Sequence, residues 1–153
     1  MTGSPSAAGL AAALWESDRH RATLDQALAE WRSLPEPSPV SLETDTALRR
    51  LTDQILYRFM KLQDALGERL VPSTLAWLLE PYESWSMRDR LDRLEKLGLL
   101  DVDQWLAWRD VRNRLAHEYP DAAQLRHAAV LAAIQAAAAL IGAYDHWKAK
   151  LPT

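Results

Sequence analysis

Apolar residues recur along most of the chain at intervals of three and four positions, which is the spacing of one face of an α-helix. The clearest case is the segment 44–66, where successive apolar positions are 3, 4, 4, 3 and 4 residues apart. These positions are Leu48, Leu51, Ile55, Phe59, Leu62 and Leu66. The sequence therefore predicts a helix here, with Thr44 capping its start and Gly67 its end.

A long helix is also expected at about 7–33, before a loop at 34–39. The middle of this helix, 16–21, is polar, so a break could interrupt it there. The loop contains three prolines in five residues, at positions 35, 37 and 39. It ends the first helix, because proline cannot continue the helical hydrogen-bond pattern.

Short helices are predicted in the middle of the chain. One follows Pro72 and stops by Pro81. Another opens at Ser86, which resembles a capping box with Asp89, and reaches position 97 before Gly98. Its expected buried residues are Met87, Leu91, Leu94 and Leu97. Its other face could be a phosphate-binding patch, but its charges alternate in sign, which favours a solvated, self-paired surface.

The last two predicted helices flank Pro120. Asp101 or Asp103 caps the first, which runs to about 118, and Asp121 caps the second, which runs to about 148. The second has an alanine-rich surface that would let another helix approach closely. No strand pattern is evident, so the expected fold class is all-α, an antiparallel helical bundle of four to five helices.

Composition narrows the class of protein. The chain of 153 residues is 48% hydrophobic and 25% charged, and it contains no cysteine. It therefore has no disulfide or thiolate metal site, and a cytoplasmic location is expected. The net charge of −3 argues against a broad nucleic-acid-binding surface.

Two segments bear on whether the chain is exported or inserted into a membrane. The N-terminus lacks the basic region of a signal peptide. The most apolar run, 128–144, is short and carries Gln135 and Gly142. It is therefore expected to be a core or interface helix, and no membrane partner is expected.

One arginine stands out in the helix before Pro120. Trp105, Trp108, Leu115 and Tyr119 recur at helical spacing, and Arg112 falls within their stripe. A guanidinium in an apolar stripe is costly unless it is paired or faces a partner. Arg112 therefore needs either a buried carboxylate or a ligand.

His117 lies about 140° away from Arg112 on a helical wheel. Asn113 and His117 are four residues apart, so they could hydrogen-bond and simply finish the helix. Arg112 and His117 would reach one spot only in two ways. Either the last turn unwinds before Pro120, or a two-fold dimer combines two copies of the motif.

The segment 112–119, RNRLAHEY, resembles the RNxxxHxY motif of the HEPN superfamily. It is most similar to HepT-type toxins, which are paired with a minimal nucleotidyltransferase antitoxin. The stretches 91–98 and 109–111 also resemble that group, and the resemblance covers about 44–148. The expected organisation is an N-terminal helical extension and proline-rich loop at 1–40, then a HEPN-like bundle at 41–150.

The resemblance implies a function as well as a fold. It implies a homodimer with both motifs lining a cleft, and a metal-independent endoribonuclease that uses no cofactor. Arg112 and His117 match the catalytic pair, and Asn113 matches the supporting polar position. Tyr119 matches the tyrosine that the partner nucleotidyltransferase modifies with AMP.

The residue types suit this chemistry independently. Cleaving RNA without a metal requires proton transfer, which histidine performs near neutral pH because its ordinary pKa is about 6.5. It also requires a cation for the charge growing on the phosphate, and a guanidinium binds phosphate oxygens in pairs. The other histidines, at 20, 127 and 146, show no metal-ligand spacing.

Other interpretations stay open. The protein could be a non-catalytic helical subunit that partners a nucleotidyltransferase, or a helical dimer without a ligand. The ring of Tyr119 could merely pack on Trp108 or Leu115, with its hydroxyl hydrogen-bonded to a backbone carbonyl.

Overall fold

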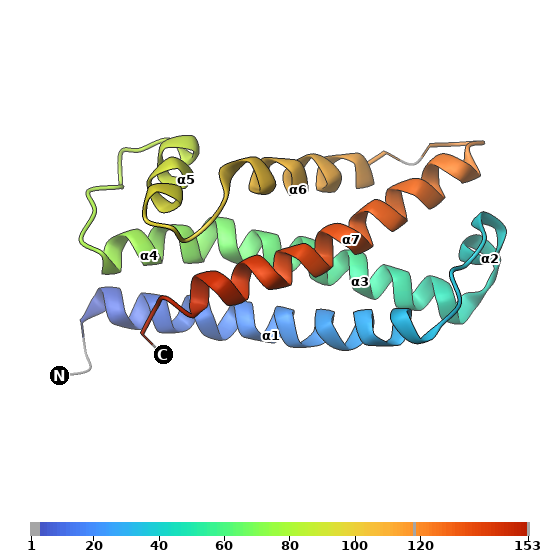
Figure 1. The fold of residues 1–153 in the computed structure, drawn as a ribbon, viewed down its shortest axis with the longest axis horizontal. Helices are drawn as coiled ribbons and strands as arrows, with labels where there is room; N and C mark the ends of the chain where they lie inside the picture. Colours follow the sequence, from blue (N-terminus) through green and yellow to red (C-terminus); the bar gives the residue numbers. More distant parts are fainter. Residues whose placement is uncertain (1–3, 118, 153) are drawn as a thin grey trace.

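The computed structural model describes residues 4–117 and 119–152, and over that part of the chain it contains helices and no strand. The helices are α1 (Pro5–Ser33), α2 (Pro39–Thr44), α3 (Thr46–Ala65), α4 (Val71–Trp77), α5 (Met87–Lys96), α6 (Val102–Leu115) and α7 (Ala123–Lys148). A π-helical turn, η1 (Leu66–Leu70), joins α3 to α4. Figure 1 shows α1, α3 and α7 packed together, with α5 and α6 along one side. The predicted all-α fold class is confirmed.

The first helix is unbroken, and the polar stretch in its middle faces partners on α7. Asp18 accepts hydrogen bonds from the Tyr144 hydroxyl at 2.6 Å and the Lys148 ammonium at 2.9 Å. Arg21 pairs with Asp145 at 2.7 Å. The polar stretch therefore joins two helices, so the break that its composition allowed does not occur.

The chain between α1 and α3 is more ordered than the three prolines suggest. Pro39 begins the short helix α2, and Ser38 caps it, because proline is well suited to the first helical turn. Thr44 is the last residue of α2, so the prediction that it caps the next helix was wrong. Asp45 caps α3 instead, and its Oδ1 accepts from the backbone N–H of Leu48 at 3.0 Å.

Gly67 does not end the helix, which corrects the second boundary prediction for this segment. The chain continues through η1 into α4, with Pro72 in the first turn of α4. A Cβ atom at position 67 would lie only 3.1 Å from Cζ2 of Trp105. Gly67 therefore lets the indole of α6 approach the α3–α4 backbone closely.

The predicted boundaries of α5 are confirmed. The hydroxyl of Ser86 accepts from the backbone N–H of Asp89 at 3.1 Å, and Gly98 follows the helix at a φ of 74°. Met87 and Leu97 are each 36% exposed, so the expectation that they are buried was wrong. The buried residues of α5 are Leu91 and Leu94.

The charged face of α5 is self-paired, as the alternating signs indicated. Arg88 pairs with Asp92 one turn along the helix at 3.1 Å. Arg93 pairs with Glu80 of the preceding loop at 2.7 Å.

The ends of α6 and α7 were predicted only in part. Asp101 caps α6, and its Oδ1 accepts from the backbone N–H of Gln104 at 3.0 Å. The helix ends at Leu115, earlier than expected. Asp121 does not cap α7, because it adopts a φ of 59° and the N-cap residue is Ala122, without a side-chain hydrogen bond.

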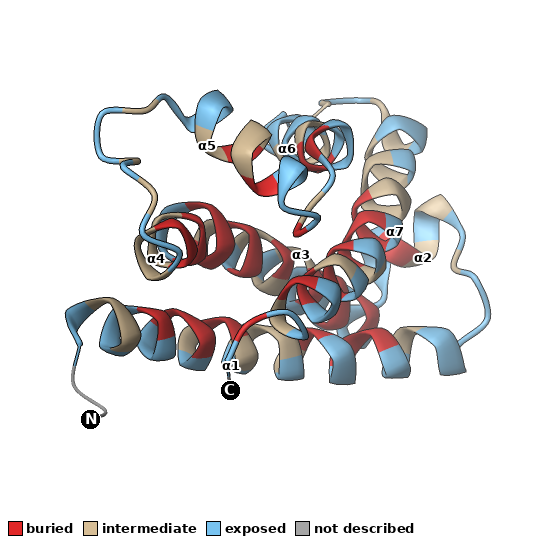
Figure 2. Ribbon diagram, turned by 60° about the vertical axis from the view of Figure 1, so that its left-hand side comes forward, coloured by how far each residue is buried: buried red, intermediate tan, exposed pale blue. Residues whose placement is uncertain are grey.

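Small residues allow α7 to cross the other long helices closely. Figure 2 shows the buried positions of α1, α3 and α7 facing one another. Ala133, Ala136 and Ala137 are all buried on α7. By length and composition alone α7 could also span a membrane, a property that core helices of soluble proteins share.

Candidate functional site

Arg112 has a partner on another helix. From α6 it donates to both carboxylate oxygens of Asp64 on α3, and the Nη2–Oδ2 distance is 3.3 Å. Its Nη1 also approaches the backbone oxygen of Met60 at 3.4 Å. Both charged side chains are 32% exposed. A half-buried carboxylate thus explains how an arginine is tolerated in the stripe of Trp105 and Trp108, which are both buried.

Within residues 4–117 and 119–152, this pairing leaves part of the guanidinium without a hydrogen-bond partner. Arginine has five N–H donors, and Asp64 and Met60 engage three of them. The remaining two, on Nε and Nη2, lie on one edge of the group. That edge matches two oxygens of a phosphate, so Arg112 can keep its carboxylate partner while it binds an anion.

Arg112 lies on the wall of a pocket of about 360 Å³ between α3, η1 and α6. The residues of α3 and η1 along it are Gln63, Asp64, Gly67 and Glu68, and those of α6 are Trp105, Arg109, Arg112 and Asn113. The negative charges of Asp64 and Glu68 balance the positive charges of Arg109 and Arg112 in this pocket. Asn113, which was predicted to support the site, is the last contributor from α6.

His117 lies beyond the end of α6. Its backbone N–H donates to the carbonyl of Arg114 at 3.1 Å in a turn, and its side chain is exposed. The imidazole lies 6.0 Å from the ring of Tyr119, tilted by 54°. Because the helix ends at Leu115, the expected pairing of Asn113 and His117 at one helical turn is replaced by this aromatic contact. The next residue, Glu118, lies outside the described residues.

The backbone of Tyr119 is fixed by contacts with α7. It adopts a φ of 46°, a left-handed conformation that is uncommon for residues other than glycine. Its carbonyl oxygen accepts from Nη1 of Arg126 at 2.6 Å, and Arg126 Nε pairs with Glu43 of α2 at 2.5 Å. The hydrogen bond from Arg126 lowers the pKa of the Glu43 carboxyl below its ordinary value. These contacts fix the turn that carries His117 and Tyr119 to the start of α7.

The other histidines have structural hydrogen bonds. A ring nitrogen of each forms a hydrogen bond of 2.9 Å. In two cases the partner is a backbone carbonyl oxygen, and in the third it is a guanidinium nitrogen. The pairs are His127 with Pro37, His146 with Gly98, and His20 with Arg58. In residues 4–117 and 119–152 no group of three or more His, Asp or Glu side chains is placed to hold a metal ion.

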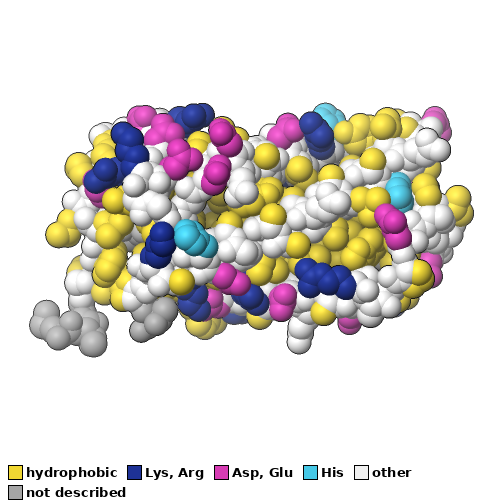
Figure 3. Space-filling model, viewed as in Figure 1, with side chains coloured by type: hydrophobic (Ala, Val, Ile, Leu, Met, Phe, Trp, Pro, Cys, Tyr) yellow, Lys and Arg dark blue, Asp and Glu magenta, His cyan; other side chains and the backbone are white. Residues whose placement is uncertain are grey.

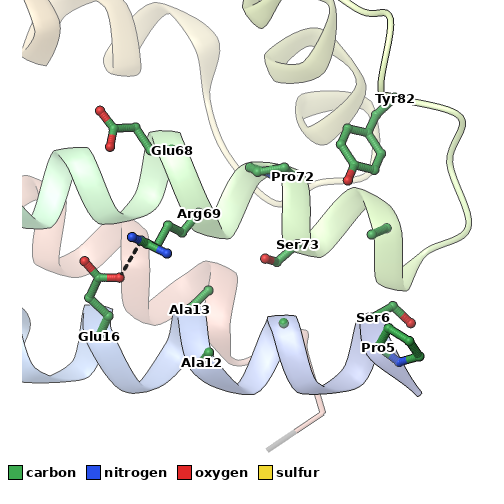
Figure 4. Close-up of a pocket in the computed structure, with 12 residues that line it drawn as sticks. Pro5, Ser6, Ala12, Ala13, Glu16, Glu68, Arg69, Pro72, Ser73 and Tyr82 are labelled. Carbon is green, nitrogen blue, oxygen red and sulfur yellow. Dashed lines mark ion pairs between the residues drawn. The ribbon is translucent and has the colours of Figure 1, made fainter. Parts of the chain in front are cut away.

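Charges of both signs are interspersed on the face seen in Figure 3. A larger pocket, of about 630 Å³, separates the start of α1 from η1 and α4. Figure 4 shows the ion pair between Glu16 and Arg69 at one end of it, where the two atoms are 2.9 Å apart. Small residues such as Gly9 and Ala12 line much of the rest. This pocket has one guanidinium along its wall, whereas the pocket at Arg112 has two.

Sequence reasoning found Arg112 as the unusual residue but did not single out Asp64, Gln63 or Glu68. These three lie on or just after α3, beside its apolar stripe, and nothing local distinguishes them from surface polar residues. Compared with protein-family models, with curated proteins and with solved structures, the chain has no match.

Proposed function

We propose that this protein is a metal-independent endoribonuclease of the HEPN type and the toxin of a toxin–antitoxin pair. The observation that carries the proposal is the RNxxxHxY motif, together with the open edge of the Arg112 guanidinium in a pocket. The exposed imidazole of His117 supports it, because a proton donor must reach the substrate.

In the proposed reaction, the 2′-oxygen of RNA attacks the adjacent phosphorus and the bond to the 5′-oxygen breaks. Protonated His117 gives its proton to the leaving 5′-oxygen, and water accepts the proton of the 2′-hydroxyl. Arg112 binds two phosphate oxygens through Nε and Nη2 and stabilises the charge that grows on them. Asp64 holds the guanidinium in place and acts as a positioning residue.

The proposed site combines two copies of the chain. In one copy, the pocket wall of α6 ends at Asn113, whereas His117 lies beyond the helix and faces solvent. A two-fold dimer built on α6 and its neighbours would bring the His117 of one copy to the Arg112 of the other. Light scattering at micromolar concentration tests this, and a clean monomer would refute the composite site.

The decisive experiment is RNA cleavage by purified protein. Arg112→Ala and His117→Ala should each abolish cleavage and cell toxicity while the circular dichroism spectrum is retained. Arg114→Ala is a matched control, because this exposed arginine on the same helix pairs with Asp110, one turn earlier, at 2.8 Å. Wild-type cleavage should persist in EDTA. Cleavage only with a divalent ion would refute the proton-transfer mechanism.

We further propose that Tyr119 is the regulatory residue. Its ring lies beside His117, so a nucleotidyl group on its hydroxyl would place bulk and a negative phosphate next to the proton donor. Co-expression with an adjacent nucleotidyltransferase should add the mass of AMP to wild type and not to Tyr119→Phe. Absence of any adduct, or normal neutralisation of Tyr119→Phe, would refute this role.

One observation favours a second candidate, a non-catalytic subunit that binds a nucleotidyltransferase. The Arg112–Asp64 ion pair already gives the guanidinium a carboxylate partner without RNA. Expression of the chain alone separates the two candidates. Toxicity that the neighbouring nucleotidyltransferase relieves supports the ribonuclease, whereas harmless expression with stable complex formation supports the binding subunit.

A further inference from the structure

Basic side chains gather where α1 packs against α3. Nη1 of Arg58 on α3 lies 2.9 Å from Nδ1 of His20 on α1. An arginine can only donate, so Nδ1 accepts this hydrogen bond and the ring is neutral, with its proton on Nε2. Burial first and then the charge of Arg58 lower the pKa of His20, and the charges of Arg19 and Lys61 lower it further. The imidazole therefore lies in a region of positive potential.

The three cations around this imidazole have no carboxylate partners. Within residues 4–117 and 119–152, Arg19, Arg58 and Lys61 form no salt bridge. Glu16 is an acidic neighbour that raises the pKa of His20, but its carboxylate pairs with Arg69 at 2.9 Å, as Figure 4 shows. Like charges held close together repel one another, and a bound anion removes that repulsion. The cluster therefore favours a negatively charged ligand.

Two exposed aromatic rings lie among the same cations. Cζ of Arg19 is 4.9 Å from the ring centre of Trp15, whose side chain is 62% exposed. Tyr57 is 50% exposed, and Cζ of Arg58 and Nζ of Lys61 lie 5.6 and 5.7 Å from its ring centre. Cations interleaved with exposed rings are typical of surfaces that bind single-stranded nucleic acid, because the charges meet phosphates while the rings stack on bases.

These side chains form a basic–aromatic patch that adjoins the candidate site. It comprises Trp15, Arg19 and His20 of α1 and Tyr57, Arg58 and Lys61 of α3, two helices that lie side by side in Figure 1. Lys61 follows Met60, whose carbonyl oxygen lies 3.4 Å from Nη1 of Arg112. Lys61 also precedes Asp64 by three residues, which makes the two side chains neighbours on the surface of α3. A strand bound at Arg112 can therefore continue over α3 onto the patch.

We propose that the basic–aromatic patch binds single-stranded RNA and leads it to Arg112. This inference rests on the proposed function, since it supplies the path by which the substrate of that reaction reaches its phosphate-binding arginine. The three cations of the patch bind backbone phosphates, and its two rings stack on bases. Arg58 turns from His20 toward a phosphate, so Nδ1 of the imidazole becomes free to take up a proton from solvent.

An anionic membrane is the other surface that basic and aromatic side chains commonly bind. A helix that binds a membrane in this way carries a continuous apolar face. In α1 and α3, which are described in full, Trp15 and Tyr57 are the only large hydrophobic side chains that are exposed, and both lie beside cations. This arrangement and the position next to Arg112 favour RNA.

Fluorescence anisotropy tests the proposal without requiring cleavage. The probe is a short, labelled 2′-O-methyl oligouridine, which has no 2′-hydroxyl and so cannot react in the proposed way. Arg58→Gln/Lys61→Gln in the full chain should weaken binding by roughly tenfold. It should also reduce the slope of log K against log salt concentration by about 1.4, because each lost phosphate contact contributes about 0.7.

The matched control is Arg32→Gln/Lys96→Gln. It removes the same charge from exposed residues at the ends of α1 and α5, away from the patch. The control should bind the oligonucleotide with nearly the wild-type affinity and salt slope. Equal affinities and slopes for the two double variants would overturn the proposal.

Substitution of Tyr57 tests stacking separately from charge. Tyr57→Leu should weaken binding by at least about fivefold, because a stacked base loses its ring, and it should leave the salt slope unchanged. Tyr57→Phe keeps the ring and should bind like wild type. The side chain is half exposed, so both variants should retain the circular dichroism spectrum. Wild-type affinity in Tyr57→Leu would refute the stacking role.

His20 provides a readout inside the patch itself. Its ring signals are followed by NMR from about pH 5 to pH 8, with and without the oligonucleotide. A phosphate beside the imidazole and the departure of Arg58 should both raise the pKa of His20. The pKa of His146, which bonds the carbonyl of Gly98, should not change. An unchanged His20 pKa in the complex would show that the strand lies elsewhere and would overturn the assignment.

The outcomes separate this inference from the proposed function. Oligonucleotide binding that depends on the patch, in a protein without ribonuclease activity, would refute the nuclease and support the patch. Cleavage that depends on Arg112 and His117, with the same KM in Arg58→Gln/Lys61→Gln as in wild type, would support the nuclease and refute the patch. Binding to vesicles that contain phosphatidylserine, without binding to the oligonucleotide, would overturn the assignment to RNA.

Discussion

The Asp64–Arg112 ion pair should contribute measurably to stability as well as to the site. Exposed ion pairs contribute about 0.2–1 kcal/mol, whereas removing one partner of a fully buried pair costs about 3–5 kcal/mol. Both side chains here are 32% exposed and the contact is bidentate, which places the pair between these limits. We expect a coupling free energy of about 1–2 kcal/mol. Asp64→Ala alone should lower the free energy of unfolding by about 2 kcal/mol, or the melting temperature by about 4–8 °C.

A double-mutant cycle measures this coupling directly. Wild type, Asp64→Ala, Arg112→Ala and the double variant are unfolded in urea and followed by circular dichroism. The pair of Arg114 and Asp110 is the matched control, because it lies within α6 and its side chains are 62% and 59% exposed. That control should couple by only about 0.3–0.5 kcal/mol. A coupling for Asp64 and Arg112 no larger than the control would show that the bridge is not maintained in solution, and the positioning role of Asp64 would fail with it.

Three further variants test packing and charge elsewhere in the fold. Gly67→Ala should destabilise the protein by about 1 kcal/mol, because the clash with Trp105 at 3.1 Å outweighs the gain in helix propensity. Gly142→Ala should stabilise it by about 0.5–1 kcal/mol in the same thermal melt, because position 142 of α7 has nothing within 4 Å of an added Cβ. Burial and then the charge of Arg58 lower the pKa of His20, so the unfolded chain takes up the proton first as the pH falls. Stability should therefore decrease from about pH 7 to pH 5, and His20→Gln should reduce that slope in urea titrations at each pH.

Local features of the fold could be predicted from the sequence because they depend on a single helix. The apolar face of α3 follows from residue spacing alone, and the caps at Ser86 and Asp101 follow from side chains three residues from the N–H groups they accept. Gly67 shows the limit of such reasoning. Its local signal is that of a helix end, whereas its actual role depends on Trp105, which reaches it from a different helix.

The candidate site was also predictable only where it depends on a single helix. Arg112 is conspicuous because its helix is otherwise apolar on that side, so the need for a partner can be read from the sequence. The identity of that partner cannot, because Asp64 is one of several polar residues bordering the stripe of α3 and only the packing of α6 selects it.

The end of α6 bears on how Arg112 and His117 could meet in the proposed site. Pro120 predicts that the helix must stop, but Tyr119 and Asp121 both adopt positive φ angles that no glycine signals, so the sequence could not give the path of the turn. The helix does unwind before Pro120, which is one of the two ways in which Arg112 and His117 could have met. Unwinding directs His117 toward Tyr119 and solvent, however, while Arg112 stays with Asp64 in the pocket. The turn is anchored by Arg126, which donates to the carbonyl of Tyr119. The proposed mechanism therefore uses the second route, in which a partner copy supplies the histidine.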